Sequence, residues 1–385
     1  MKKFGSGISY FTVDLIRIYK SSSGAQDFEE KRDRYLDSQN RPADSIYRGL
    51  DYDRMAKLTD FVERYLDCVT PENETKMEIY FRKDQPAFIG GRVNTDLFDF
   101  SYADKIYTFV KENGMDIRLH PIVWYRHVPP QLKAYLEGRS AQDCRRLAFD
   151  FIRAFMQGLQ TRYPDPYSVD VLNEIAADPD ELSAMREAGD PVYEYDEDGV
   201  RIDQWYKWLG RGYYIEVLRM AREIFGDKVR LFYNDNNEGN REKQRFFKAI
   251  VENIQAYERE NGVKLLDGFG MQCHFWGSED EDRDYIEQMF SFMSRLGVEL
   301  NVTEFDVSNH STKKIQNAIF EGFIEVAPKY VEVFTAWGLN DVVSWLHEDE
   351  PTLIDRSCDF KPFTEKYIRA FSRKYELRDR RKEHE

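Results

Sequence analysis

Short apolar runs alternate along the chain with longer segments in which apolar residues recur every three or four positions. The short runs are typical of buried β-strands, and the recurrence in the longer segments indicates helices with one apolar face. The runs that predict strands are Phe4–Ser9, Leu66–Thr70, Asp116–Val123, Ser168–Asn173, Val229–Asn234, Asp267–His274, Val298–Glu304 and Val331–Gly338. The segments that predict helices include Tyr102–Asn113, Asp143–Arg162, Gln204–Phe225, Arg241–Asn261, Tyr285–Arg295 and Lys313–Ala327.

Strands that alternate regularly with helices predict an α/β fold, here a (β/α)8 TIM barrel in a single domain of residues 1–375 with insertions on its rim. An open doubly wound sheet is the alternative, but no GxGxxG or phosphate-binding loop follows any strand. Residues 17–50 are polar and predict helix and loop on the rim. The acidic segment Ala177–Asp203 predicts a long loop insertion, and residues 376–385 predict a charged C-terminal tail.

Composition and charge exclude several classes of protein. Of 385 residues, 42% are hydrophobic and 32% are charged, which is typical of a folded globular chain. With 55 Lys and Arg against 70 Asp and Glu, the formal net charge is −15, which disfavours binding to nucleic acid or to anionic lipid. No apolar run approaches the ~18 residues that a membrane helix needs. We therefore expect no nucleic-acid partner and no membrane contact.

The cysteine content bears on compartment and cofactors. Cys68, Cys144, Cys273 and Cys358 are widely separated and lack the CxxC spacing of a metal site. Reduced thiols fit a cytosolic protein better than a disulfide framework. No apolar segment of the kind found in a secretory signal follows the first basic residues. We expect a cytoplasmic protein without metal or cofactor, or a secreted one if a signal has been removed.

Polar residues cluster at the carboxyl ends of the predicted strands. All strands of a parallel barrel end on one face, where active sites lie, so these residues are expected to converge. They are His120, Asn173, Glu174, Asn234, Asp235, Gln272, His274, Glu304 and Trp337.

Two glutamates of this set, Glu174 and Glu304, are candidates for catalysis. Cleavage of a glycosidic bond needs a proton donor for the leaving oxygen and a second carboxylate for the anomeric carbon. A single strand-end glutamate is more often a structural ion-pair partner. A pair on two strands, flanked by Asn and His, favours the catalytic interpretation.

Several motifs occur in a fixed order between about residues 60 and 370. They are TPENETK (70–76), HPIVW (120–124), DVLNE (170–174), GMQCH (270–274), TEFD (303–306) and a closing series of Trp337-Gly338, Asp341, Ser344-Trp345 and Lys361-Pro362. As a set they resemble the motifs of the family 10 glycoside hydrolases, the endo-β-1,4-xylanases.

The resemblance implies a retaining hydrolysis of xylan or xylo-oligosaccharides by double displacement. Glu174 would be the general acid/base and Glu304 the nucleophile, with Asp306 and His274 hydrogen-bonded around the nucleophile. The residues implied to bind substrate are Asn73, Lys76, His120, Trp124, Asn173, Gln272, His274, Trp337 and Trp345. Taken singly, the tryptophans would more often belong to a core and Lys76 to a solvated surface. Trp205 and Trp208, three residues apart on a predicted helix, are interpreted as packing residues.

Four positions depart from the family pattern. Tyr125 stands where the family usually has His, Val169 where it has Trp, Asn236 where it has a Tyr of the leaving-group subsites, and Leu346 where it has Arg. These changes put the leaving-group side in question, and not the catalytic pair. A related β-glycanase or β-glycosidase acting on cellulose-type or aryl glycosides remains an alternative, as does a non-catalytic barrel that only binds sugars.

Overall fold

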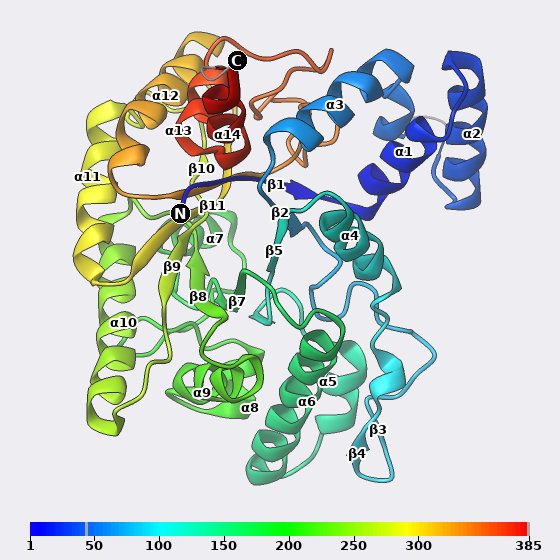
Figure 1. The fold of residues 1–385 in the computed structure, drawn as a ribbon. Helices are drawn as coiled ribbons and strands as arrows, with labels where there is room; N and C mark the ends of the chain where they lie inside the picture. Colours follow the sequence, from blue (N-terminus) through cyan, green and yellow to red (C-terminus); the bar gives the residue numbers. More distant parts are fainter. Residues whose placement is uncertain (43–44, 383–385) are drawn as a thin grey trace.

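The computed structural model describes residues 1–42 and 45–382, with side chains up to residue 377, and its helices surround a central set of strands (Figure 1). In the described residues, eight parallel strands close into a barrel in the order β1-β2-β5-β7-β8-β9-β11-β12, because β12 pairs back onto β1. The barrel strands are β1 Lys3–Ile8, β2 Cys68–Pro71, β5 Asp116–Leu119, β7 Ser168–Asn173, β8 Arg230–Asp235, β9 Gly268–Met271, β11 Glu299–Val307 and β12 Val333–Ala336. The predicted barrel is confirmed.

Two predicted strands are interrupted near their carboxyl ends. The predicted strand Asp116–Val123 divides into β5 and β6 (Val123–Trp124), with Pro121 between them, which has no N–H to donate to a ladder. The predicted strand Asp267–His274 divides into β9 and β10 (His274–Phe275), and Cys273 between them has a left-handed φ of 56°. Both interruptions lie at the mouth of the barrel. A small antiparallel hairpin, β3 (Phe88–Ile89) with β4 (Arg92–Val93), lies outside the barrel.

The predicted helical segments form helices in the structure, and one of them is broken. The α-helices are α1 Tyr10–Lys20, α2 Ala25–Ser38, α3 Tyr52–Tyr65, α4 Ser101–Glu112, α5 Pro130–Leu136, α6 Ala141–Arg162, α7 Pro179–Ala188, α8 Gln204–Leu209, α9 Tyr213–Phe225, α10 Arg241–Asn261, α11 Arg283–Met293, α12 Lys313–Val326, α13 Thr364–Phe371 and α14 Arg373–Lys382. Short 3-10 turns cover Ile46–Gly49, Thr95–Leu97, Ser294–Leu296 and Ala327–Lys329. The single predicted helix Gln204–Phe225 is wrong: it divides into α8 and α9 because Gly210 and Gly212 adopt φ of 82° and 73°.

The core lies between the barrel and its helices. In α10, the buried side chains of Phe247, Ile250 and Ile254 recur every three or four residues and face the strands. The ring centroid of Phe247 lies 5.0 Å from that of Phe269 on β9, which in turn lies 4.8 Å from Tyr233 on β8. Full burial of each such side chain contributes about 1.5–3 kcal/mol. This packing fixes the outer side of the strands, so that their carboxyl ends present side chains at defined positions.

The rim segments contain more helix than their polar composition predicts. Residues 17–50 include the end of α1, all of α2 and a 3-10 turn, and the Tyr35 hydroxyl of α2 donates to Asp14 of α1 over 2.6 Å. The predicted loop Ala177–Asp203 contains α7. The expected tail is helical from residue 376 to Lys382 as part of α14, and residues 383–385 lie outside the described residues.

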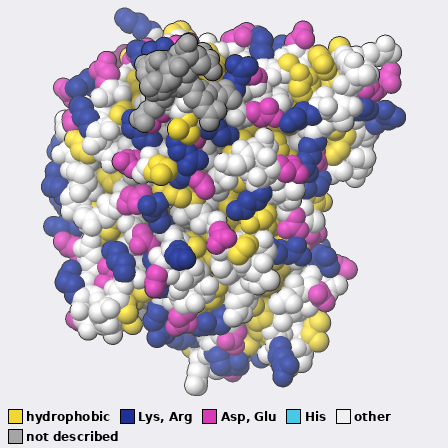
Figure 2. All heavy atoms as spheres, viewed as in Figure 1, with side chains coloured by type: hydrophobic (Ala, Val, Ile, Leu, Met, Phe, Trp, Pro, Cys, Tyr) yellow, Lys and Arg dark blue, Asp and Glu magenta, His cyan; other side chains and the backbone are white. Residues whose placement is uncertain are grey.

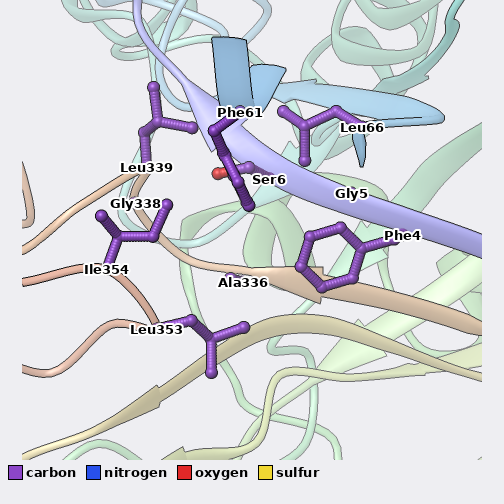
Figure 3. A pocket seen from close by; sticks show the side chains of 10 residues that line it. All are labelled: Phe4, Gly5, Ser6, Phe61, Leu66, Ala336, Gly338, Leu339, Leu353 and Ile354. Atoms are coloured by element: carbon purple, nitrogen blue, oxygen red, sulfur yellow. The ribbon is translucent and has the colours of Figure 1, made fainter. Parts of the chain in front are cut away.

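The surface carries charges of both signs (Figure 2), and a small apolar pocket lies among the strands and helices beneath it. On the face shown in Figure 2, Lys and Arg are interspersed with Asp and Glu. The apolar pocket in Figure 3, between β1, β12 and α3, is lined by Phe4, Phe61 and Leu353 among others and has a volume of about 10 Å³. That is room for about one water molecule. In the described part of the chain, no helix has the length and apolar character to cross a bilayer.

Candidate active site

A cleft of about 770 Å³ opens at the carboxyl ends of the barrel strands. Its walls include every residue that was predicted to catalyse the reaction or bind substrate, from Asn73 after β2 to Trp345 after β12, while Asp306 lies behind His274. Residues that are up to 272 positions apart in the chain therefore share one cavity. The sequence argument that strand ends converge locates this cleft.

Glu174 follows β7 in a constrained conformation. Its φ is 51°, in the left-handed region that non-glycine residues rarely adopt, and its backbone N–H donates to the carbonyl of Asn234 over 2.9 Å. The carboxylate accepts from Trp124 Nε1 at Oε2 (2.8 Å) and from Gln272 Nε2 at Oε1 (3.0 Å). Strain of this kind costs about 1–3 kcal/mol and persists where the surroundings fix it, commonly at active sites. Two neutral donors thus hold the carboxyl group of Glu174.

Glu304, on β11, is held by positive charge. Asn234 Nδ2 donates to Oε1 over 2.7 Å, His274 Nε2 lies 3.5 Å from Oε2, and His120 Nε2 lies 3.8 Å from Oε1. Burial alone would raise the pKa of Glu304. The charges of His120, His274 and Lys76 and the hydrogen bond from His274 outweigh burial and hold the pKa at about 2. The Glu304 carboxylate is therefore ionised at every pH at which the protein would work.

His274 is oriented from behind by Asp306. Its Nδ1 lies 2.8 Å from Asp306 Oδ1, and the other oxygen of Asp306 accepts from Trp345 Nε1 over 2.7 Å. Burial would lower the pKa of His274, but Asp306 and Glu304 together hold it well above its ordinary value. The cation beside Glu304 is thus maintained by a second buried carboxylate.

An amide network links the two glutamates. Asn173 Oδ1 accepts from Asn234 Nδ2 (2.8 Å) and from Gln272 Nε2 (3.4 Å), while Asn234 Oδ1 accepts from Thr303 Oγ1 (2.7 Å). Because the oxygen of Asn173 is held by two donors, the orientation of its amide is fixed.

One end of the cleft lies beside β2 and β12. Lys76 Nζ donates to Asn73 Oδ1 over 3.1 Å and lies 5.0 Å and 5.9 Å from the ring centroids of Trp124 and Trp337. Burial lowers the pKa of Lys76, although the nearby carboxylates oppose this effect. Glu72 also lines this end and was missed by the sequence reasoning. Burial and the charge of Glu74 raise its pKa to about 8. In the sequence, the position of Glu72 directly before Asn73 was the only indication that it would line the cleft.

The acidic insertion contributes to the cleft wall. Asp178 caps the N-terminus of α7 through the N–H groups of Asp180 and Glu181, and these three carboxylates line the cleft. Farther along the insertion, Glu197 and Asp198 pair with Arg211. The insertion therefore overhangs the cleft with its first turn, and its later acidic series does not line it.

Two buried cations pair with carboxylates of the insertion and neutralise much of their charge. The sequence did not indicate these pairs. Arg201 Nη2 lies 2.7 Å from Glu181 Oε2, and its guanidinium lies between the rings of Tyr125 (3.9 Å) and Tyr193 (3.7 Å). Lys243 Nζ lies 2.9 Å from both Asp178 and Asp235 and donates to Asn236 Oδ1 over 2.5 Å. The residues that depart from the family pattern, Tyr125 and Asn236, thus belong to these local networks.

The interpretation of Trp205 and Trp208 as packing residues agrees with their burial, at 0% and 9% exposed. Trp205 also donates from Nε1 to the backbone carbonyl of Trp124 over 3.1 Å. It therefore fixes the segment that carries a cleft residue. Among the side chains that the structure describes, no group of three or more His, Cys, Asp or Glu is arranged to hold a metal ion.

A TIM barrel with two carboxylates in a cleft at the carboxyl ends of its strands is an arrangement that glycoside hydrolases use. A family model of glycosyl hydrolase family 10 matches residues 42–370. The chain belongs to this family.

The curated relatives agree with this assignment. Endo-1,4-beta-xylanase A of Caldicellulosiruptor sp. (strain Rt8B.4) is 29% identical over 325 residues, which cover 79% of this chain and 42% of the relative. The enzyme of the same name from Thermotoga maritima is 30% identical over 327 residues, covering 79% of this chain and 28% of the relative. The chain thus spans less than half the length of these relatives.

Among solved structures, an endo-1,4-beta-xylanase from Caldicellulosiruptor owensensis superposes with a TM-score of 0.67 at 19% identity, covering 95% of this chain and 96% of that one. A xylanase from Thermoanaerobacterium saccharolyticum gives a TM-score of 0.66 at 20% identity, with 95% of each chain covered. These likenesses establish the shared fold.

Proposed function

We propose that the chain is a retaining endo-β-1,4-xylanase that hydrolyses xylan or xylo-oligosaccharides. The observation that carries the proposal is the different environment of two carboxyl groups in one cleft. Glu304 is surrounded by His274, His120 and Lys76, whose charges keep it ionised, while Glu174 is held by the neutral donors Trp124 and Gln272. Glu304 is suited to attack the anomeric carbon, and Glu174 is the second carboxyl group that the reaction needs to exchange a proton with the leaving oxygen and with water.

The proposed reaction uses the two carboxyl groups in turn. Glu174 donates its proton to the glycosidic oxygen as a carboxylate oxygen of Glu304 bonds to the anomeric carbon and the bond to the leaving sugar breaks. Glu174, now ionised, then takes a proton from water, whose oxygen attacks the anomeric carbon and releases Glu304. Two inversions at one carbon retain the β configuration. Asn173, whose amide is held by Asn234 and Gln272, is the proposed donor to the substrate 2-hydroxyl.

The proposed glycone site is the end of the cleft that holds Asn73, Lys76, Trp124 and Trp337. Flat indole faces suit the C–H faces of pyranose rings, and the amine and amide suit the hydroxyls. The similarity to endo-1,4-beta-xylanases supports xylan as the polymer. Another relative, a thermostable celloxylanase from Thermoclostridium stercorarium, is 28% identical over 298 residues, so activity on cellulose-type chains is the second candidate.

The decisive experiment compares ladders of xylo- and cello-oligosaccharides, with proton NMR of the fresh product. We expect turnover of the xylo ladder and an initial β-anomer signal. Faster turnover of the cello ladder would favour the second candidate, and an initial α-anomer would exclude double displacement. Binding of both ladders without any turnover would identify a sugar-binding barrel.

We also propose a cytoplasmic location, with short xylo-oligosaccharides imported from outside as the natural substrate. All four cysteines are buried and unpaired, which suits a reducing compartment. Cell fractionation with a periplasmic marker tests this location, and recovery of the protein with the marker would overturn it.

A further inference from the structure

The cleft has a second end that lies opposite the Asn73–Lys76 end. In the barrel order β1-β2-β5-β7-β8-β9-β11-β12, β2 and β9 are four positions apart, so they face each other across the mouth. Asn73 and Lys76 follow β2, and Trp276 follows β10, the short strand directly after β9. Glu174 after β7 and Glu304 on β11 come from the strands that flank this line. A sugar chain that crosses the catalytic pair from Lys76 therefore extends toward Trp276.

Trp276 is a large apolar side chain that remains open to solvent inside this cleft. It lines the cavity with 56% of its surface exposed, close to the value of 57% for Trp345 in the same cavity. Trp205 and Trp208, by contrast, are buried. An exposed indole in a concave site that also offers polar groups is suited to stack on a sugar ring.

The backbone that carries Trp276 is fixed by one carboxylate. Glu281 accepts from the N–H of Trp276 at Oε1 (3.0 Å) and from those of Gly277 and Ser278 at Oε2 (2.8 and 3.0 Å). Gly277 has a φ of 77°, and a Cβ there would lie 2.3 Å from the carbonyl oxygen of Ser308. The turn is therefore closely packed against the segment that follows β11, and it holds Trp276 in a defined place.

A second ring supports the indole. The ring of His310, from the segment after β11, lies 5.4 Å from that of Trp276 with an interplanar angle of 35°. His310 is itself 58% exposed on its side chain, so this contact belongs to the rim and not to the core. A fixed turn and a supporting ring are what a binding platform needs, since a mobile indole would lose entropy on binding.

We propose that Trp276 is a stacking platform for a sugar ring on the leaving-group side of the cleft. The inference rests on the proposed function, because it takes the Lys76 end as the glycone site. The ligand is a pyranose unit of the β-1,4-linked chain, bound through its C–H face. Trp276 thus sets the preference for substrates that extend beyond the cleaved bond.

The test compares two substrates that differ on the leaving-group side. Nitrophenyl β-xylobioside places sugars only at the glycone end, whereas xylohexaose fills both ends. For Trp276→Ala we expect kcat/KM on xylohexaose to fall about 3- to 10-fold, the range of one aromatic stacking contact, with the aryl substrate unchanged. Trp276→Phe keeps a ring and should retain most of the activity. Phe360→Ala removes an aromatic side chain that is 39% exposed outside the cleft and serves as the control.

The outcomes distinguish a failure of the stacking platform from a failure of the proposed function. Equal losses on both substrates, or an unchanged rate on xylohexaose, would overturn the platform. If the wild-type protein does not cleave the aryl xyloside but cleaves the aryl cellobioside, the proposed substrate is wrong, and the same comparison with cellohexaose tests the platform. Inactivity on both series would overturn the proposed function and the platform together.

Discussion

Glu304 is the residue at which burial and charge compete most directly. The residue is only 6% exposed, and burial alone would raise its pKa. The pKa is nevertheless about 2, because His120, His274 and Lys76 surround the carboxyl group. The motif that contains Glu304 could be recognised from the sequence. The charges that ionise it come from three different strands or their loops, and only the folded barrel brings them close to its carboxyl group. The sequence therefore predicted Glu304 as a candidate nucleophile, but it did not predict that the surrounding charges would lower the pKa of its carboxyl group.

The roles of the two glutamates predict different losses on substitution. Glu304→Ala should abolish turnover of all glycosides, since no nucleophile remains. Glu174→Ala should lower kcat/KM on xylan by about 10²–10⁴-fold, the usual contribution of general acid catalysis. It should lower the glycosylation rate on an aryl xyloside much less, because that leaving group needs no proton. Equal losses of Glu174→Ala on both substrates, measured by steady-state and burst kinetics, would contradict the assignment.

His274 provides a pH prediction with a defined sign. Replacement by Gln removes a positive charge near Glu304, so the pKa of Glu304 should rise from about 2 toward its ordinary 4.5. The acidic limb of the kcat/KM profile should then move to higher pH. Because the folded-state pKa lies below the unfolded one, Glu304 stabilises the fold above pH 4.5, and this contribution is lost as pH falls toward 2. An acidic limb that does not move would show that another group controls it.

At the scale of elements, strong apolar periodicity predicted the strands and the long helices well. The barrel strands and the long helices α6, α10 and α12 follow their predicted ranges within a few residues. The prediction of a loop for residues 177–203 is wrong at Pro179–Ala188, which form α7 although the segment is acidic. Asp178 as N-cap, Pro179 at the first helical position and Gly189 with φ of 74° all mark α7. Arg201 and Lys243 could not be assigned to the cleft from the sequence, because only their ion pairs with Glu181, Asp178 and Asp235 in the folded chain bring them there.

The buried pair between β5 and β7 gives a prediction for stability. Arg118 Nη2 lies 2.7 Å from Asp170 Oδ1, and the side chains are 0% and 1% exposed, while Asp170 Oδ2 lies 3.0 Å from His120 Nδ1. Arg118→Leu leaves a carboxylate buried without its main partner, so urea unfolding should show a loss of about 3–5 kcal/mol. The double variant with Asp170→Asn should recover part of it. A loss below 1 kcal/mol in the single variant would show that the pair is not essential to the fold.

At the scale of the whole molecule, the catalytic face carries a charge pattern that the net charge of −15 does not describe. Among the cleft carboxylates of the insertion, Asp178 is paired with Lys243 and Glu181 with Arg201. Asp180 accepts only from the amides of Asn237 and Asn240 in the described contacts. If these carboxylates had no cationic partners, they would repel an acidic substrate. Their buried partners reduce that repulsion to little more than the charge of Asp180.

This balance predicts a small, salt-dependent discrimination against xylan that carries glucuronic acid. Exposed charges contribute on the order of 0–1 kcal/mol per pair, so kcat/KM on a glucuronosylated oligosaccharide should lie at most about 5-fold below that on the linear one. The difference should shrink as ionic strength rises from about 0.01 to 0.1 M, because the screening length falls from about 30 to 10 Å. Asp180→Asn should also reduce it, whereas Asp190→Asn, on the same insertion but outside the cleft, should not. A preference that survives both high salt and Asp180→Asn would assign the selectivity to shape, at Tyr125 or Asn236.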